Sequence, residues 1–153
     1  MLKLDLNKPA ASEVWPESRA ASKRVLSNTS TALLQGDYVY SAKTSGELVC
    51  LEAGTGNQVW QTNTVTDLKN GSSIHLTPNG DSVLLFTNEG NLIRARLSPN
   101  GYQELCRAHL LDAIYPFGGR NVVWPPPAYA NRHVFARNEQ ELVCASLAGG
   151  PPR

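Results

Sequence analysis

The sequence has few of the residues that mark a catalytic or metal centre. Its 153 residues include three cysteines, three histidines and one methionine, and aromatic residues make up only 7% of the chain. The cysteines and histidines form no CxxC pair and no cluster at metal-ligand spacing. The sequence also lacks a Gly-x-Ser-x-Gly elbow and a glycine-rich phosphate loop. We therefore expect no catalytic, cofactor-binding or metal-binding residue.

An excess of one charge and a long apolar run are also missing. Fourteen basic and thirteen acidic residues leave a formal net charge of +1, and the charges are scattered along the chain. Nucleic acid is therefore not an expected partner. No apolar run reaches the roughly 20 residues that cross a bilayer, so no transmembrane segment is expected. The first residues, MLKLDLNKPAASEVW, hold charges and a proline before any apolar stretch develops and predict no signal peptide.

What the sequence does contain is a repeated pattern of short apolar runs. Its clearest copy, residues 36–60, reads GDYVYSAKTSGELVCLEAGTGNQVW, with strand-length segments separated by glycine turns. The apolar positions alternate or run continuously over four to six residues, and no ten-residue stretch holds a helical stripe. This pattern predicts an all-β fold of antiparallel strands in a meander.

The repeat has a period that is typical of four-stranded propeller blades. Trp15 and Trp60 lie 45 residues apart, and Gly46 and Gly90 lie 44 apart. We predict one repeat domain over residues 1–153, with two, four, four and three strands in successive units. The units are the back half of a blade with a linker (1–28), two complete blades (29–70 and 71–112) and an incomplete last blade (113–153).

Two segments depart from the regular pattern. In the first complete blade, residues 31–34 are expected to form the innermost strand. In the last unit, residues 114–119 are interpreted as an insertion, and Trp124 is followed by Pro125, Pro126 and Pro127 where an innermost strand belongs. Because proline cannot donate a ladder hydrogen bond, that strand must be very short or lie at an edge.

The unit at 36–60 resembles the pyrroloquinoline-quinone-like β-propeller repeat. The resemblance rests on Gly36-Asp37 before an aromatic strand, the Gly-x-Leu-x-x-Leu pattern at 46–51, Ala-Gly-Thr-Gly at 53–56, and the closing Trp60. The other units match in part. Complete propellers of this family carry about seven or eight blades, and this chain resembles the C-terminal portion of one. It is then either a piece of a longer protein or a short chain that closes a ring by self-association, forming a homodimer in which the two starting strands complete a neighbour's last blade.

The resemblance gives a structural role to two tryptophans. Trp15 and Trp60 match the blade-end tryptophan that packs between neighbouring blades in this family. Cys50 and Cys144 recur in the same Glu-Leu-Val-Cys tetrapeptide and are expected to be small core residues on strands.

Four further residues are candidates for contacts at the channel or the loops. His75 lies on an expected innermost strand, Trp124 breaks the repeat period, and Arg120 and Arg137 belong to a loose arginine group that could bind an anionic group. A structural alternative stays open for each of them, since an isolated histidine, an aromatic beside prolines and a surface arginine all occur without a ligand.

The expected function is a non-enzymatic β-propeller binding or scaffolding module that contacts a protein or a small ligand through its loops or channel. The alternative is a fragment of a quinone-dependent dehydrogenase, for which the family resemblance implies pyrroloquinoline quinone and calcium as cofactors. The chain also resembles the propeller lipoproteins of the bacterial outer-membrane assembly machine, which bind a partner protein and catalyse nothing. The family resemblance suggests a periplasmic or exported bacterial protein.

Overall fold

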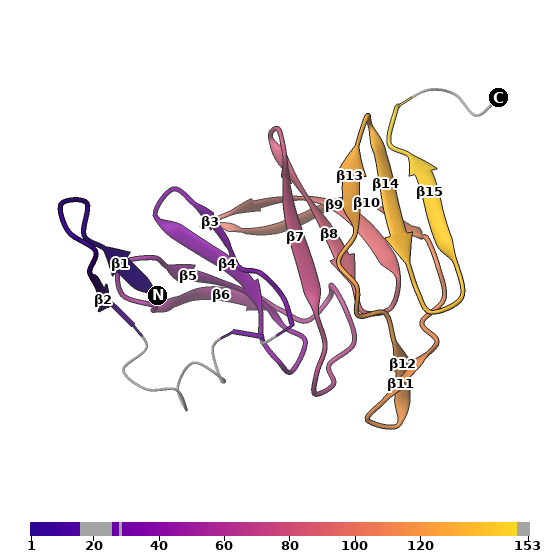
Figure 1. Cartoon of the computed structure of the whole chain (residues 1–153), viewed down its shortest axis with the longest axis horizontal. Helices are drawn as coiled ribbons and strands as arrows, with labels where there is room; N and C mark the ends of the chain where they lie inside the picture. Colours follow the sequence, from indigo (N-terminus) through magenta and orange to yellow (C-terminus); the bar gives the residue numbers. More distant parts are fainter. Residues whose placement is uncertain (16–25, 28, 150–153) are drawn as a thin grey trace.

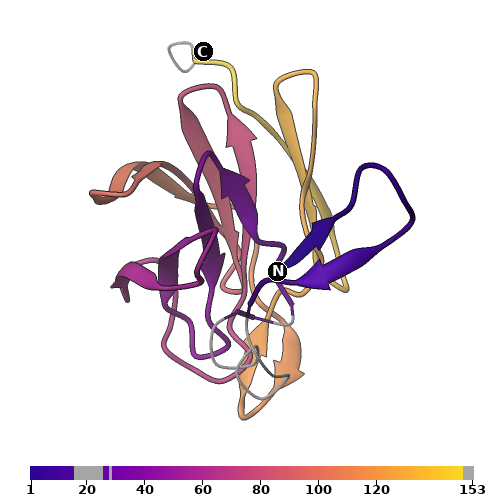
Figure 2. The same ribbon diagram turned by 90° about the vertical axis from the view of Figure 1, so that its left-hand side faces the viewer.

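The computed structural model describes residues 1–15, 26–27 and 29–149, and all regular structure in these residues is β-strand. Antiparallel sheets follow one another along the chain and form a stack that runs from left to right in Figure 1. Figure 2 views the same stack from its N-terminal end, with the first hairpin in front. Within the described residues, no helix has the length and hydropathy needed to cross a membrane. The predicted all-β class is confirmed.

The stack begins with a two-stranded hairpin and a four-stranded meander. The hairpin pairs β1 (Leu2–Leu4) with β2 (Ala11–Glu13). The meander consists of β3 (Leu33–Gln35), β4 (Tyr38–Ala42), β5 (Leu48–Glu52) and β6 (Gln58–Thr62), each hydrogen-bonded to the next.

The innermost strand of this first meander is shifted from its expected position. Strand β3 begins at Leu33, two residues later than the sequence suggested. The preceding Ser30 is engaged elsewhere, since its hydroxyl accepts a hydrogen bond of 2.8 Å from the backbone N–H of Ile74 in the next sheet. The shift therefore reflects a contact between successive sheets that local sequence does not encode.

The second meander is the longest-stranded sheet of the molecule. It consists of β7 (Ile74–Asn79), β8 (Ser82–Thr87), β9 (Asn91–Ser98) and β10 (Gly101–His109), again in sequential order. Strand β8 is buried along its whole length, whereas β10 forms an exposed edge.

The last sheet has three strands and is preceded by a hairpin that the sequence interpretation missed. The sheet pairs β13 (Ala128–Ala130), β14 (His133–Arg137) and β15 (Leu142–Ser146) in order. Strand β13 is both short and at the sheet edge, as the preceding prolines require.

Residues 114–119, which the sequence predicts to be an insertion, lie in a hairpin that the sequence interpretation did not identify. Strand β11 (Tyr115–Phe117) pairs with β12 (Arg120–Val122), and Phe117 stands opposite Arg120. The two-residue loop is Gly118-Gly119, with φ values of 58° and 80°. Positive φ at both loop residues is the conformation that matches the twist of paired strands, so two glycines favour this turn.

The core lies between successive sheets rather than within one. One cluster of buried side chains packs Trp15, which follows the first hairpin, against the first meander, a second joins the two meanders, and a third joins the second meander to the three-stranded sheet. The largest fully buried side chains include Tyr40, Leu48, Ile74, Leu85, Phe86 and Ile93. The two meanders and the three-stranded sheet therefore depend on their neighbours for burial, as expected of a repeat architecture.

Two equivalent glycines allow the connections between sheets to approach the β4–β5 and β8–β9 turns closely. A Cβ on Gly46 would meet the carbonyl oxygen of Asp67, and a Cβ on Gly90 would meet that of Leu111. Both glycines have positive φ, at 105° and 78°. The sequence repeat at 44 residues thus corresponds to a repeated close backbone approach.

Gly90→Ala is expected to lower the free energy of unfolding by about 2 kcal/mol or more, because the left-handed backbone and the Leu111 carbonyl both oppose a side chain. Urea unfolding followed by tryptophan fluorescence measures the change. Gly54→Ala is the matched control, since open space surrounds Gly54 and no positive φ is recorded there. Equal stabilities of the two variants would contradict the close approach.

Candidate functional site

The connections between sheets gather at one end of the stack, and this end carries the candidate site. We call it the connection face, formed by residues 43–47, 63–73, 88–90, 110–127 and 138–141. It is the lower side in Figure 1, where the hairpin of β11 and β12 projects. The middle turn of each meander and the β14–β15 turn, at 43–47, 88–90 and 138–141, also belong to this face, whereas the opposite end carries the first and last turns of the meanders, including 99–100 between β9 and β10.

A largely buried ion pair fixes the β11–β12 hairpin on the connection face. Arg120 Nη1 donates to both carboxylate oxygens of Asp67, at 2.9 and 2.8 Å. Its Nη2 donates to the hydroxyl of Ser72 at 3.2 Å and to the carbonyl of Asn70 at 3.3 Å. The side chains of Arg120 and Asp67 are only 9% and 19% exposed. The pair therefore joins two connections that lie 53 residues apart in the chain.

Asp67 is the centre of this polar network. It also accepts hydrogen bonds from Asn88 Nδ2 at 3.0 Å and from Ser72 Oγ at 2.9 Å. Burial alone would raise the pKa of Asp67, but these hydrogen bonds, together with the charges of Arg120 and Lys69, hold the pKa below its ordinary value. The carboxylate is thus ionised and already surrounded by donors.

Two of the turns on this face each carry an asparagine that is hydrogen-bonded to a connection between sheets. Asn88 bonds to the 63–73 connection through its backbone N–H, which donates to the Ser73 carbonyl, and through its side chain. Asn138, at the corresponding turn of the last sheet, donates from Nδ2 to the Asp112 carbonyl at 3.0 Å. The connections are therefore tied to the sheets in a repeated way.

Aromatic rings cover part of the connection face beside the ion pair. Phe117 and Trp124 meet edge to face, with ring centroids 4.9 Å apart and planes at 80°. The Phe117 ring also packs on Gly71, where a side chain would collide with it. Tyr115 and Phe117 remain 43% and 37% exposed, and Leu68 on the neighbouring connection is 51% exposed.

A pocket of about 390 Å³ opens beside these rings. The described residues of its lining are uncharged and comprise two aromatic side chains, three hydroxyl residues, one amide and one glycine. They are Ser27, Thr29, Thr44, Asn70, Gly71, Phe117 and Trp124. The hydroxyl of Thr44 is buried and has no hydrogen-bond partner in the described part of the chain.

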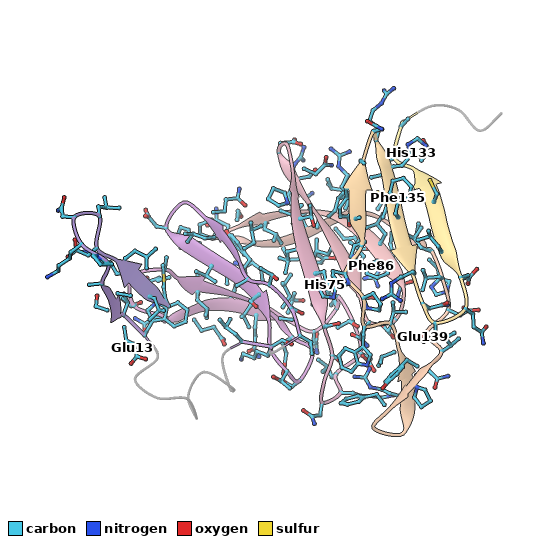
Figure 3. The ribbon with its side chains drawn as sticks, viewed as in Figure 1. Glu13, His75, Phe86, His133, Phe135 and Glu139 are labelled. Carbon is cyan, nitrogen blue, oxygen red and sulfur yellow. The ribbon has the colours of Figure 1, made fainter. Side chains whose placement is uncertain are left out.

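The structure places His75 near this region. His75 lies on β7 opposite Phe86 of β8, and the Trp124 backbone partly offsets the lowering of its pKa by burial. Figure 3 shows His75 and Phe86 in the interior of the stack, whereas His133 and Phe135 lie on the last sheet. The Nε2 atom of His75 and the hydroxyl of Tyr129 on β13 are buried without a partner among the described residues. Burial raises the pKa of Tyr129 to about 12.

The stability of the protein is expected to fall as the pH drops from about 7.5 to about 5.5. Burial lowers the pKa of His75, and the Trp124 backbone offsets only part of that effect. The unfolded chain then binds the proton more readily, so stability present above the ordinary histidine pKa is lost below it. Carboxylates with lowered pKa, such as Asp67, titrate at still lower pH.

Melting temperatures at the two pH values test this expectation. His75→Gln should remove most of the loss, which we expect to be a few degrees, and His133→Gln should retain it. An unchanged pH dependence in the His75 variant would show that another group is responsible.

The two tryptophans at the repeat period make equivalent hydrogen bonds. Trp15 Nε1 donates to the Ala53 carbonyl at 2.7 Å, and Trp60 Nε1 donates to the Ser98 carbonyl at 2.8 Å. In both cases the acceptor lies 38 residues further along the chain, in the following sheet. Trp15 also packs on Gly56, where a Cβ would lie 2.6 Å from the indole.

The four residues that the sequence suggested for contacts at the channel or the loops do not all lie together in the structure. His75, Trp124 and Arg120 lie at or beside the connection face, and Trp124 contacts the hairpin that Arg120 holds. Arg137 ends β14 as an exposed residue and is not a hydrogen-bond partner in the described network of Arg120. Cys50 is buried, whereas Cys144 is exposed because it faces away from the neighbouring sheet.

Sequence reasoning missed several residues of the site. Asp67 lies in a polar connection with no distinguishing motif, and its partner Arg120 is far away in the chain. Phe117 could have been found, since Gly118-Gly119 between two short β-prone segments is a hairpin signal. Among the described residues, no group of three or more histidine, cysteine, aspartate or glutamate side chains could hold a metal ion.

Three comparisons place this architecture among known proteins. A family model described as outer membrane protein assembly factor BamB matches residues 4–150. No curated protein matches the sequence. The solved structures that are similar include BamB from Moraxella catarrhalis, with 18% identity and a TM-score of 0.60 over 95% of this chain and 39% of that one.

Two further structures share the fold at similarly low identity. A europium-containing methanol dehydrogenase is 14% identical, with a TM-score of 0.52 over 88% of this chain and 31% of that one. The Cps50 (Swd1) β-propeller domain of Myceliophteria thermophila is 16% identical, with a TM-score of 0.52 over 98% of this chain and 52% of that domain. The chain thus spans at most about half the length of these structures, and the predicted partial β-propeller is confirmed. By its family match the chain belongs to the family of outer membrane protein assembly factor BamB and is a pyrroloquinoline-quinone-like β-propeller repeat protein.

Proposed function

We propose that this chain is a non-enzymatic β-propeller binding or scaffolding module that contacts a protein through its connection face. The observation that carries the proposal is the β11–β12 hairpin, which projects from that face with exposed aromatic side chains at Tyr115 and Phe117. Aromatic residues supply large contact areas and are enriched at protein interfaces.

The way the hairpin is held supports a binding role. The Arg120–Asp67 pair and the packing of Phe117 on Gly71 fix the hairpin before any partner arrives. A surface that is already ordered loses less conformational entropy on association, so more of the contact energy appears as affinity. The exposed Leu68 extends the same surface onto the neighbouring connection.

The family match supports the same proposal. The matched family is described as an outer membrane protein assembly factor, a description that concerns protein assembly. The similar solved structures are all below 25% identity and support the fold alone. The role in binding therefore rests on the connection face and on the family description together.

Photo-crosslinking tests the proposed surface. A photoreactive benzoylphenylalanine is placed at Tyr115 and, as the control, at Asn100 in the exposed β9–β10 turn at the opposite end of the sheets. In an extract of the source cells, the Tyr115 position should capture one defined protein, and Phe117→Ser should abolish the capture. Equal capture from both positions, or none from either, would contradict the proposal.

The rival function is that of a quinone-dependent dehydrogenase segment, as the fold likeness to a methanol dehydrogenase suggests. Calcium prefers six to eight oxygen ligands. The most buried carboxylate of the site, Asp67, is instead surrounded by Arg120, Ser72 and Asn88, so the described residues do not fit that cofactor set. Calorimetric titration with pyrroloquinoline quinone and calcium separates the two functions, because saturable stoichiometric binding would favour the dehydrogenase.

We also propose that the chain can self-associate to extend its stack. The outer face of the last sheet exposes Leu142 (68%) and Cys144, and the free side of β15 has no neighbour among the described strands. The β1–β2 hairpin exposes Leu2 and Leu4, at 60% and 69%. A hairpin from a second copy would complete the three-stranded sheet and cover an unpaired edge. Light scattering on a sizing column at several concentrations should show a stable dimer, and a monomer at every concentration would contradict self-association.

A further inference from the structure

Trp124 differs from the other two tryptophans because its indole N–H has no hydrogen-bond acceptor among the described residues. Trp15 and Trp60 each donate from Nε1 to a backbone carbonyl, at 2.7 and 2.8 Å. No acceptor for Trp124 Nε1 is found within residues 1–15, 26–27 and 29–149, and this nitrogen is not among the buried atoms without a partner. Among the described residues, the Trp124 N–H is therefore a donor without an acceptor, on a side chain that lines the pocket described above.

The chemistry of the pocket narrows the class of ligand. Among the described residues, no charged side chain lines it, so neither an anion nor a cation is favoured. Its hydroxyl groups are partly occupied, because Ser27 Oγ is hydrogen-bonded to Thr29 Oγ1 at 2.9 Å and to the Ser72 carbonyl at 3.3 Å. The pocket offers the aromatic rings of Phe117 and Trp124, the Trp124 N–H, and the Thr44 hydroxyl, which has no partner in the described part of the chain.

We infer that this pocket binds a proline-containing, extended segment of a protein partner. The inference rests on the proposed function and names the chemistry of the partner. A polyproline II segment has no internal hydrogen bonds, presents free carbonyl acceptors, and docks in grooves lined with aromatic rings. The proline ring packs against Trp124 and Phe117, and the adjacent carbonyl accepts the Trp124 N–H. A pocket of about 390 Å³ is at the small end of the usual range for binding sites and suits one or two residues.

The hairpin positions one wall of this pocket. Phe117 stands opposite Arg120 in the β11–β12 pairing, so the ion pair with Asp67 fixes the ring next to Trp124. Gly71 allows this approach, since a Cβ there would collide with the Phe117 ring. The proline site is therefore formed before binding.

The experiment uses the full chain labelled with ¹⁵N and a blocked decaproline peptide as the probe. Trp124→Phe identifies which of the three indole N–H signals belongs to Trp124. With the peptide at millimolar concentration, the Trp124 signal should shift and those of Trp15 and Trp60 should not. Trp124→Phe, which keeps an aromatic ring but removes the donor, should weaken binding by about fivefold to tenfold. Phe117→Leu should weaken it as well, with the remaining indole signals unmoved.

The outcomes separate this inference from the proposed function. If the decaproline peptide causes no shift while crosslinking at Tyr115 still captures a protein, the proline site is wrong and the binding module stands. If a linear oligosaccharide such as maltohexaose shifts the Trp124 signal and the peptide does not, the ligand class is wrong. If both the peptide and the crosslink fail, the proposed function fails with the inference.

Discussion

Arg120→Met is expected to lower the free energy of unfolding by about 3 kcal/mol, because it leaves the Asp67 carboxylate in a largely buried site without its main counter-charge. Urea unfolding measures this loss. Asp67→Asn should cost a similar amount, since it leaves the Arg120 guanidinium without its partner. The double variant Asp67→Leu/Arg120→Met should lose less than the sum of the single changes, because the two groups interact directly.

An exposed ion pair on the same protein supplies the control. Arg96 Nη2 lies 3.2 Å from Asp81 Oδ2, and the two side chains are 54% and 67% exposed. Arg96→Met should therefore cost much less than Arg120→Met. Equal losses for Arg120→Met and Arg96→Met would mean that the Arg120–Asp67 pair does not hold the hairpin.

Trp60→Ala is expected to cost about 3–5 kcal/mol, because it removes a large ring from the boundary between the two meanders and leaves a cavity. The ring packs on Tyr40, with centroids 6.0 Å apart, and its N–H bonds to the Ser98 carbonyl of the next sheet. Trp60→Phe keeps most of the packing but loses the hydrogen bond, so it should cost about 1–2 kcal/mol. Chemical unfolding monitored by circular dichroism gives both values.

The neighbouring residue provides a control for this second prediction. Val59 lies on the same strand but is 41% exposed, so Val59→Ala should change stability by no more than about 0.5 kcal/mol. If Trp60→Ala were no more costly than Val59→Ala, the indole would not join the two sheets. The same logic applies to Trp15, whose hydrogen bond has the same spacing along the chain.

The repeated parts of the fold could be predicted from the sequence because they are local. Apolar alternation and glycine turns define β4, β5, β8 and β9, and the 44-residue period brings Gly46 and Gly90 to equivalent turns. The period of Trp15 and Trp60 reflects one repeated interaction between sheets. Predicting such features requires only the neighbouring residues in the sequence or the repeat itself.

The sequence indicated Arg120, Trp124 and His75 as candidates, but how they come together could not be predicted, because the site depends on contacts between distant segments. Arg120 and Asp67 are 53 residues apart, and neither belongs to the repeat pattern. The order of residues around Trp124 gives no sign that Phe117 folds back onto it. The Gly118-Gly119 turn was a usable local signal, but where its hairpin docks is decided by Gly71 and the ion pair.

The protection of backbone amides from hydrogen exchange tests the central claim most directly. The chain is compared alone and in complex with the protein captured at Tyr115. We predict slower exchange in peptides that cover residues 114–124 and 67–71, with little change in the turns at 79–82 and 98–101 at the opposite end of the sheets. Slowing confined to those opposite turns, with none at the β11–β12 hairpin, would contradict the claim that the connection face binds the partner.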